Sequence, residues 1–364
     1  MAKLHSLSIS GYKSIKNMEH LELKNLNILI GANGSGKSNF ISLFRLLNAI
    51  GNRNLNNYVE KQGGINSFLH FGRKKTDKIH IEFYFDNNSF KFDIVPTNDN
   101  NKVSFKLREV KIKLDIGQEQ IPLFSEEINL SPETINFSKI NSVNIFRMAL
   151  ESKWTIYHFH DTSETANVKD TNRINDNLKL KYDAANLAAY LRKIREQYPA
   201  EYQRIVETIR LVLPFFHDFV YREEKNLEYI ELEWYQKEDL DTPLKAHMLS
   251  DGSLRFICLA TLLLQPLELL PDTIIIDEPE LGLHPYAISV LADIFKQVAE
   301  DKQLIIATQS VELINEFEPE DIIVVEQHNG SSSFKRLSSE ELNVWLKDYS
   351  LGELWDCNII GGRP

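Results

Sequence analysis

A glycine-rich stretch near the start of the chain has the residue types that hold a chain of phosphates. Residues 31–38, Gly-Ala-Asn-Gly-Ser-Gly-Lys-Ser, have the spacing G-x-x-x-x-G-K-S. Glycines allow backbone N–H groups to surround a β-phosphate, Lys37 reaches the β- and γ-phosphate oxygens, and the Ser38 hydroxyl suits Mg²⁺. We therefore predict a nucleoside triphosphate site. Its predicted binding residues are Asn33, Gly34, Ser35, Gly36, Lys37 and Ser38.

Two adjacent carboxylates follow an apolar segment later in the chain. The run Thr273-Ile-Ile-Ile leads directly into Asp277 and Glu278. Carboxylates at the C-terminal tip of a strand in an open parallel sheet meet bound phosphate groups. Asp277 suits the water shell of Mg²⁺, and Glu278 suits polarising the water that attacks a γ-phosphate. The predicted metal ligands are thus Ser38 and Asp277, and Glu278 is a predicted catalytic residue.

A third stretch, Leu249-Ser-Asp-Gly-Ser-Leu-Arg255, opens a helical pattern. Ser250 and Asp251 are residue types that cap a helix N-terminus, and Gly252 permits another backbone or a phosphate to approach closely. A Ser-Asp-Gly turn alone is common in proteins. Because this segment precedes the acidic strand, we nevertheless regard it as part of the predicted site.

The periodicity of apolar residues predicts the elements that must position these segments. The run Asn27-Ile-Leu-Ile30, apolar after its first residue, predicts a strand that enters the glycine-rich loop, and apolar side chains at helical spacing predict a helix over residues 39–51. Residues 52–64 are polar, and we expect a loop there. Alternating apolar and polar side chains over residues 79–94, interrupted at Asn87-Asn88, predict a β-hairpin.

Further elements follow from the same patterns. Residues 102–114 predict a strand whose basic outward face suits either solvent or phosphate groups, and we favour solvent. Because no heptad seam persists over three or four repeats, we expect no long coiled coil. The other predicted elements are strands over 4–10, 227–234, 304–308 and 322–325, and helices over 187–194, 201–213 and from Tyr286 onward.

Two histidines lie on one side of a strand predicted over residues 154–161. Because side chains two residues apart share a face, His158 and His160 could together bind a metal, or each could be a hydrogen-bonded structural residue. Apart from the adjacent Asp161, the sequence offers no evident third ligand. This lack favours the structural interpretation.

Composition sets the broad class of the protein. The chain has 364 residues, 43% hydrophobic and 26% charged, which suits one large or two moderate domains. The start has no apolar signal core, and the run 256–270 is broken by Gln265 and Pro266, so we expect a cytoplasmic protein without a membrane partner. Two cysteines make no disulfide framework, and Cys258 lies in an apolar pattern typical of a core. The net charge of −11 argues against nucleic-acid binding over the whole surface but not at a local basic patch.

Together these segments resemble the ATP-binding-cassette ATPases of the RecF, SMC and OLD-like group, and within it the small stand-alone AAA-family ATPases of bacterial gene clusters. The resemblance covers residues 1–75 and about 240–328. Two further segments, His158-Phe-His-Asp-Thr-Ser163 and Gly361-Gly-Arg-Pro364, are similar to features of the small subgroup, with no mechanism evident for either. The five segments that carry the resemblance are Gly11-Tyr12-Lys13-Ser14, similar to the N-terminal aromatic–basic–serine element, 31–38, similar to Walker A, 249–255, similar to the signature motif, 274–278, similar to Walker B, and 279–285, similar to the D-loop.

The resemblance implies an α/β fold of the P-loop NTPase type, with a mixed central sheet and an insertion that is β-rich first and helical second. It implies ATP and Mg²⁺ as ligands, and it adds Lys13, Ser250 and Gly252 to the nucleotide-binding residues. The expected division is 1–75 for the N-terminal part of the ATPase domain, 76–240 for the insertion, 241–328 for the C-terminal part and 329–364 for a tail.

The same resemblance implies an assembly. The signature residues Ser250 and Gly252 of one subunit would face the γ-phosphate held by Lys37 of another, so that two ATP molecules are shared in a head-to-tail dimer. A γ-phosphate that contacts both subunits favours the closed dimer, and hydrolysis releases it. We therefore expect a homo-oligomer, a dimer or a multiple of dimers, that acts as a nucleotide-gated clamp or switch.

One position departs from the family pattern. Where many relatives have a switch histidine after the strand over 304–308, this chain has Gln309. A glutamine can orient a water or a γ-phosphate oxygen but cannot become cationic, so we predict slow hydrolysis with Gln309 as the second catalytic residue. Gln62 is available as the Q-loop glutamine, and its assignment stays open.

The family analogy also suggests biological roles. Residues 329–364 offer no acidic metal cluster like that of the TOPRIM domain in OLD-like nucleases, so we expect no nuclease activity and a separate effector protein as partner. An anti-phage defence system would suit such a clamp. The alternative is a DNA-repair loader or sensor that binds DNA through patches such as Arg73-Lys74-Lys75. A third reading, the motor subunit of a membrane transporter, is disfavoured by the N-terminal Gly-Tyr-Lys-Ser element and the long insertion.

Overall fold

The computed structural model divides the chain into two compact units. The first contains Met1–Trp154 and Glu318–Pro364, and the second contains Thr155–Phe317. These borders differ from the motif-based borders at 75, 240 and 328, and the four-part division stays an interpretation. The structure describes residues 3–85, 88–97, 103–113, 120–124, 128–130, 154–222 and 228–363.

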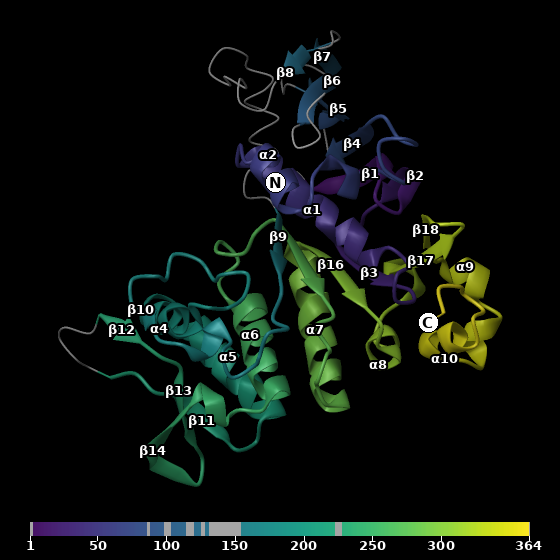
Figure 1. Ribbon diagram of the computed structural model, residues 1–364. Coiled ribbons are helices and arrows are strands. Elements are labelled where there is room, and N and C mark those ends of the chain that lie inside the picture. Colours follow the sequence, from purple (N-terminus) through teal and green to yellow (C-terminus); the bar gives the residue numbers. More distant parts are fainter. Residues whose placement is uncertain are drawn as a thin grey trace. The chain divides into compact units, whose positions relative to one another are not determined.

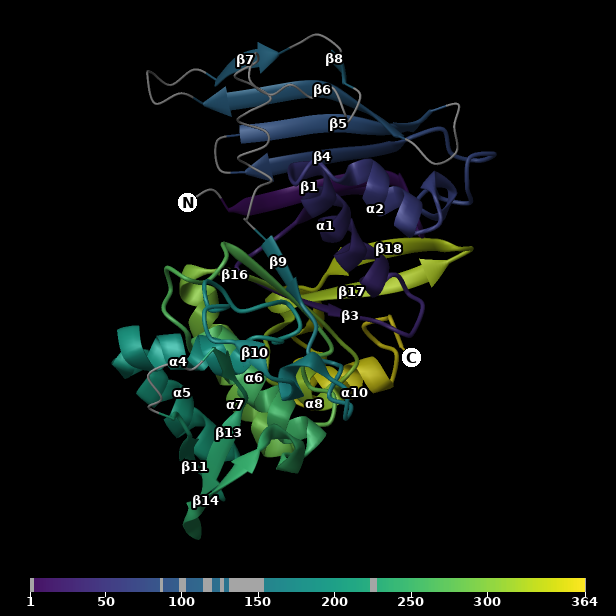
Figure 2. The ribbon, with the colours of Figure 1, turned by 60° about the vertical axis from the view of Figure 1, so that its left-hand side comes forward.

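The first unit contains an antiparallel sheet with the strand order β2-β1-β4-β5-β6-β7, in which β8 also pairs with β6. Figure 2 shows β1, β4, β5 and β6 side by side. The pairing of Phe83 with Phe90 confirms the predicted hairpin, whose turn at residues 86–87 lies outside the described residues. The strands are β1 (Leu4–Tyr12), β2 (Ile15–Glu22), β4 (Ile79–Phe85), β5 (Asn88–Pro96), β6 (Val103–Lys113), β7 (Gln120–Phe124) and β8 (Ile128–Leu130).

A mixed sheet in the same unit carries the glycine-rich loop. Strand β3 (Leu26–Ile30) runs parallel to β17 (Ile322–His328), and β17 pairs antiparallel with β18 (Ser331–Arg336). All five residues of β3 are buried, which explains why all but Asn27 are apolar. The predicted mixed sheet is confirmed. The expected last strand continues to residue 328 and returns as β18, a strand that the apolar pattern did not indicate.

Helix α1 (Lys37–Gly51) follows the loop, as predicted, and buries Phe40, Leu43, Phe44 and Leu47. The prediction of a loop over residues 52–64 is wrong, because this segment contains α2 (Leu55–Lys61). Its two buried residues, Leu55 and Val59, are four positions apart and therefore lie on one helical face. Two apolar anchors in a polar segment are too few to give a visible helical period.

The C-terminal segment of the first unit consists of short turns and helices that end near the glycine-rich loop. Helix α10 (Leu351–Asp356) begins at a capping box formed by Ser350 and Glu353, and it buries Leu354 and Trp355 completely. Figure 1 shows this segment in yellow, beside β17 and β18. The remaining short elements of the first unit are η1 (Ile65–Ser67), η4 (Pro319–Asp321), α9 (Ser339–Leu342) and η5 (Trp345–Lys347).

The second unit contains the acidic strand. Strand β15 (Thr273–Asp277) runs parallel to β16 (Gln303–Thr308), and α7 (Pro285–Asp301) connects them. Helix α6 (Asp251–Leu264) packs against α5 (Pro199–Val212) and α7 and is almost entirely buried. Parallel strands joined by a helix leave their carboxyl ends at one edge, which places Asp277 and the residues after Thr308 together.

The rest of the second unit is helical and β-structured. The predicted helices over 187–194 and 201–213 are confirmed as α4 (Leu187–Gln197) and α5 (Pro199–Val212). Strand β9 (Trp154–Tyr157), which begins with the last residue before this unit, is shorter than predicted, so both histidines lie after it. No helix within the described ranges is long and apolar enough to cross a membrane. The remaining elements are η2 (Asn167–Lys169), β10 (Asn172–Arg173), β11 (Phe216–Phe219), β12 (Tyr229–Ile230), β13 (Glu233–Gln236), β14 (Asp239–Lys245), η3 (Ala246–Met248) and α8 (Val311–Ile314).

Candidate active site

The glycine-rich loop joins β3 to α1 in the first unit. Gly36 stands at the N-cap of α1 with a φ of 121°, a conformation that side chains rarely adopt. A Cβ atom on Gly36 would collide with the side chain of Ser332 and lie 3.0 Å from Ser14 Oγ. Only glycine fits this position. Asn33 and Gly34 on the loop and Ser38 in the first turn of α1 are exposed, whereas Ser35, Gly36 and Lys37 are buried.

Lys37 is held within the loop itself. Its ammonium group donates hydrogen bonds to the carbonyl oxygens of Gly31 and Ala32, the second at 3.1 Å. The residue is only 5% exposed. Long lysine side chains usually lose much rotamer entropy when they bind a ligand, and these contacts have already fixed this one. The lysine is thus held against the first two residues of the loop.

A buried serine on β18 supports the loop, although no sequence pattern singles this residue out. Ser332 Oγ lies 2.6 Å from the carbonyl oxygen of Ser35 and 2.7 Å from Ser14 Oγ, and its N–H donates to the Ser14 carbonyl at 2.7 Å. Asn39 Nδ2 also donates to Ser14 Oγ, at 2.7 Å. Ser332 is one of three consecutive serines, so nothing in its neighbourhood distinguishes it.

Lys13 lies in the turn between β1 and β2. Its ammonium group donates to Ser42 Oγ on α1 at 2.9 Å and lies 5.5 Å from the centre of the Phe68 ring. Burial, together with the nearby Arg45 cation, lowers the pKa of Lys13. The structure places Lys13 against α1, and its predicted contact with the nucleotide stays a prediction.

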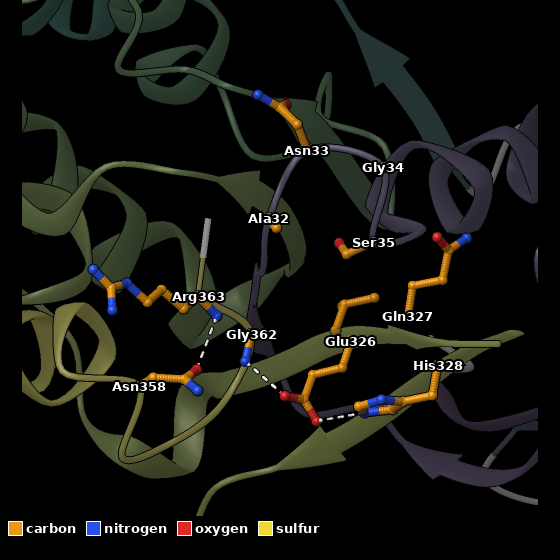
Figure 3. A pocket seen from close by; sticks show the side chains of 11 residues that line it. Ala32, Asn33, Gly34, Ser35, Glu326, Gln327, His328, Asn358, Gly362 and Arg363 are labelled. Atoms are coloured by element: carbon orange, nitrogen blue, oxygen red, sulfur yellow. Dashed lines mark hydrogen bonds and ion pairs between the residues drawn. The ribbon is translucent and has the colours of Figure 1, made fainter. Parts of the chain in front are cut away.

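A pocket of about 500 Å³ lies beside the loop, between residues 32–35, the end of β17 and the C-terminal tail. Figure 3 shows Glu326 directed toward the Gly362 N–H, which donates to Glu326 Oε1 at 2.9 Å. This hydrogen bond lowers the pKa of Glu326. Gly362 and Arg363 of the tail therefore lie beside the phosphate loop, while Pro364 lies outside the described residues. Cys357, which precedes the pocket residue Asn358, is exposed, whereas Cys258 is buried in α6, as expected.

The second unit brings the two predicted catalytic residues together. Glu278 follows the last residue of β15, with a positive φ of 44°, and its N–H donates to the Ala307 carbonyl at 2.7 Å. Gln309 follows β16, and its Nε2 donates to Glu278 Oε1 at 2.6 Å. The amide thus orients the carboxylate by a charge-assisted hydrogen bond. Asp277, the predicted metal ligand, is the adjacent residue at the same strand end.

A second glutamate lies behind this pair, and the sequence placed it only within the D-loop segment. Glu280 Oε1 accepts hydrogen bonds from Thr308 Oγ1 at 2.6 Å and from the Gln309 N–H at 3.2 Å. Its Oε2 is buried without a hydrogen-bond partner among the residues that the structure describes, and burial raises the pKa of this carboxyl. Glu280 fixes the start of the loop that carries Gln309.

The signature-like segment lies at the N-terminus of α6 in the same unit. Ser250 is the N-cap, as predicted, and its Oγ accepts the Ser253 N–H at 3.2 Å. A Cβ atom on Gly252 would collide with the Gly282 carbonyl oxygen, so the helix end rests directly on the D-loop backbone. Glycine at position 252 therefore serves the close approach that its residue type predicts.

The two histidines form no metal cluster. Within the part of the chain that the structure covers, no group of three or more His, Cys, Asp or Glu side chains could hold a metal ion. His160 Nε2 instead contacts the carbonyl oxygen of Asp277 at 2.6 Å. This contact supports the structural interpretation of His160.

The family whose description is "AAA domain, putative AbiEii toxin, Type IV TA system" matches residues 26–315. The chain belongs to this AAA family. The match begins at β3 and ends after α8, so it includes the phosphate loop, the signature-like segment and the acidic strand. No curated protein matches this AAA protein significantly.

Two solved structures are similar over almost the whole chain. The SMC head bound to the C-winged helix domain of ScpA has a TM-score of 0.59 and 16% identity, and the match covers 94% of this chain and 99% of that chain. An SMC head domain with an extended coiled coil, bound to the C-terminal domain of ScpA from Pyrococcus furiosus, has a TM-score of 0.56 and 15% identity, with 96% and 99% covered. This AAA protein therefore has the α/β P-loop fold of the RecF/SMC-like ATP-binding-cassette ATPases, as the motifs predicted.

Proposed function

We propose that this AAA protein binds Mg·ATP, hydrolyses it slowly and acts as a nucleotide-gated dimeric clamp that regulates a partner effector. The observation that carries the proposal is the hydrogen bond between Gln309 and Glu278 at the edge of the parallel strands, because it presents a carboxylate and a neutral amide for a water molecule. The phosphate loop supports it through the fixed Lys37 ammonium group.

The oxygen donors fit a hard divalent cation. Ser38 offers an exposed hydroxyl in the first turn of α1, and Asp277 offers a carboxylate at the end of β15. When bound, Mg²⁺ would neutralise the charge that develops on the transferred phosphoryl group. The chain's own contribution is to hold the phosphates with Lys37 and loop N–H groups and to polarise the attacking water with Glu278.

The slow rate follows from Gln309. A neutral amide orients a water or a γ-phosphate oxygen but adds no positive charge in the transition state. Turnover should therefore show no loss of rate on lowering the pH through the histidine range. Fast turnover that loses most of its rate in that range would contradict the proposal.

Gating of the dimer by ATP requires that the signature residues be accessible to a second copy of the chain. Gly252 rests on the D-loop backbone, and Ser250 is exposed at the helix N-terminus, so both can face a phosphate held by a second copy. The similar SMC heads are bound to domains of ScpA, which supports a protein effector by analogy. The family description names a toxin of a toxin–antitoxin system, which supports a role in bacterial defence.

Light scattering of the Glu278→Gln variant tests the clamp. Blocked hydrolysis should trap the ATP-bound state, so its mass should double with Mg·ATP and return to the starting value without it. The same variant with Lys37→Ala is the matched control and should not respond. A mass that ATP leaves unchanged in Glu278→Gln would contradict nucleotide gating.

A DNA-binding role is the second candidate, and one surface favours it. Arg73, Lys74 and Lys75 are exposed and follow Phe71, which is 65% exposed. Of these, Phe71 and Lys75 line a pocket of about 870 Å³ together with Lys16. Phosphate neutralisation there would make DNA affinity fall steeply with salt. Replacing the three basic residues by alanine should flatten the salt dependence, and binding that is absent or insensitive to salt would remove this candidate. The basic face of β6 supports it less, because Arg108 binds Asp93.

A further inference from the structure

The histidine segment, residues 158–163, contacts the backbone of Asp277, the predicted magnesium ligand. His160 Nε2 lies 2.6 Å from the carbonyl oxygen of Asp277. Because a carbonyl oxygen only accepts, Nε2 carries the proton and donates it. The contact therefore fixes the peptide group between Asp277 and Glu278. These are the two carboxylates on which the proposed hydrolysis depends.

A buried arginine holds the same segment from the other side. Arg255 Nε donates to the Phe159 carbonyl at 2.9 Å, and its second terminal nitrogen donates to the His160 carbonyl at 3.2 Å. Arg255 is 4% exposed, and a buried cation is tolerated only with such hydrogen bonds. Its planar fork can reach two successive carbonyls at once, which an ammonium group cannot do with the same geometry.

Arg255 belongs to the signature helix and also lies against the D-loop. It follows Gly252 by three residues on α6, about one helical turn. A Cβ atom on Gly282 would lie 3.1 Å from Arg255 Nη1. The N-terminal end of α6, the D-loop and the histidine segment therefore form one packed cluster within the second unit.

We propose that Arg255 and His160 form a relay that positions Asp277 and Glu278 according to the position of the signature end of α6. When a nucleotide on a second copy engages Ser250 and Gly252, the relay would pass the displacement to the carboxylates of the same subunit. This inference rests on the proposed function, because it describes how ATP hydrolysis at the proposed site would be regulated. Both are positioning residues, because neither is placed in contact with the nucleotide.

Hydrogen exchange of the protein without nucleotide tests the relay directly. The reporting group is the Glu278 N–H, which donates to Ala307. His160→Ala and Arg255→Lys should both raise exchange in the peptide covering residues 273–280. His247→Ala is the matched control, because His247 is exposed on the turn before α6, and it should leave that peptide unchanged. Unchanged exchange in either relay variant would overturn the inference.

Nucleotide binding and turnover then separate positioning from general stability. In His160→Ala, calorimetry should give an unchanged affinity for ATP without Mg²⁺, while the Mg²⁺ requirement rises and kcat falls about 10–100-fold, as for other supports of metal ligands. His160→Gln should restore most of kcat, because the glutamine Nε2 can donate to the same carbonyl. A double variant with Arg255→Lys should be no slower than the worse single variant. Effects that multiply would overturn the relay.

The two sets of measurements distinguish a failure of the proposed function from a failure of the relay. If the wild type neither hydrolyses ATP nor changes mass with it, the proposed function fails, and the exchange experiment still decides whether the relay exists. If the clamp works but His160→Ala keeps its Mg²⁺ requirement and kcat, the relay fails alone. Circular dichroism of each variant confirms that the fold is retained before either comparison.

Discussion

The phosphate loop and the acidic strand end are built by different means. The loop takes its shape from closely spaced glycines and from one lysine that bonds to its own loop carbonyls, with Ser332 as one distant support. The strand end takes its shape from side chains of segments far apart in sequence, as the contacts of Glu278 with Gln309 and of Asp277 with His160 show. Changes in the loop should therefore alter nucleotide affinity, and changes at the strand end should alter turnover.

Glu278→Gln should give the largest effect and should fall on turnover alone. Loss of the carboxylate removes the group that polarises the water, and such losses lower kcat by about 10²–10⁴-fold. ATP affinity should stay within a few-fold, because the loop supplies it. Steady-state phosphate release and calorimetric titration measure the two quantities. Equal losses in kcat and in ATP affinity would contradict the proposal that the loop determines affinity and the strand end determines turnover.

Glu280→Ala should give the next largest effect. Without this carboxylate, Thr308 and the Gln309 N–H lose their acceptor, so kcat should fall about 10–100-fold with ATP affinity unchanged. Glu280→Gln should stay within a few-fold, since its amide oxygen can accept both hydrogen bonds. Glu312→Ala, an exposed glutamate on α8, is the control. If Glu280→Ala weakens ATP binding as much as turnover, the strand end is not independent of the loop.

Ser332→Ala should act on the loop and so on affinity. Its hydroxyl contacts Ser35 and Ser14, and the loss of one to two hydrogen bonds of about 1 kcal/mol each should weaken ATP binding by about 5–30-fold. The kcat at saturating ATP should be unchanged. Ser333→Ala, an exposed neighbour on β18, is the matched control. A kcat that falls while affinity holds would reverse the assignment.

The smallest effect is expected away from both regions, at His80 on β4. Its hydrogen bond to the buried Asp93 carboxylate, 2.6 Å long, raises the pKa of His80. A raised pKa stabilises the fold below the ordinary histidine value near 6.5, and this contribution is lost as pH rises through the raised pKa. The stability gap between wild type and His80→Gln should therefore shrink from pH 6 to pH 9, by less than about 1 kcal/mol. Urea titrations measure it, and a constant gap would contradict it.

Sequence patterns predicted the elements with strong periodicity and the motifs whose residues are consecutive. The alternation over residues 79–94 gave the hairpin, and helix α1 followed from its apolar spacing. Helix α2 was missed because only Leu55 and Val59 anchor it. These cases show that a local signal is visible when the element itself carries many buried residues.

The supporting residues of the site were not predictable in the same way. Ser332 supports a loop about 300 residues earlier in the chain, and its residue type is common on any surface strand. Glu280 looked like one more acidic residue of the D-loop until its contacts with Thr308 and Gln309 placed it. Their roles depend on long-range contacts that periodicity does not encode.

The two cysteines differ in accessibility, and this difference allows one of them to be labelled selectively for spectroscopy. Cys258 is buried within α6, where burial raises the pKa of its thiol to about 12 and so keeps it in the unreactive protonated form. Cys357 is exposed and adjoins Asn358, which lines the pocket beside the phosphate loop. A maleimide dye should therefore attach at a single place on the unaltered chain. It would report events at the loop as a change in emission.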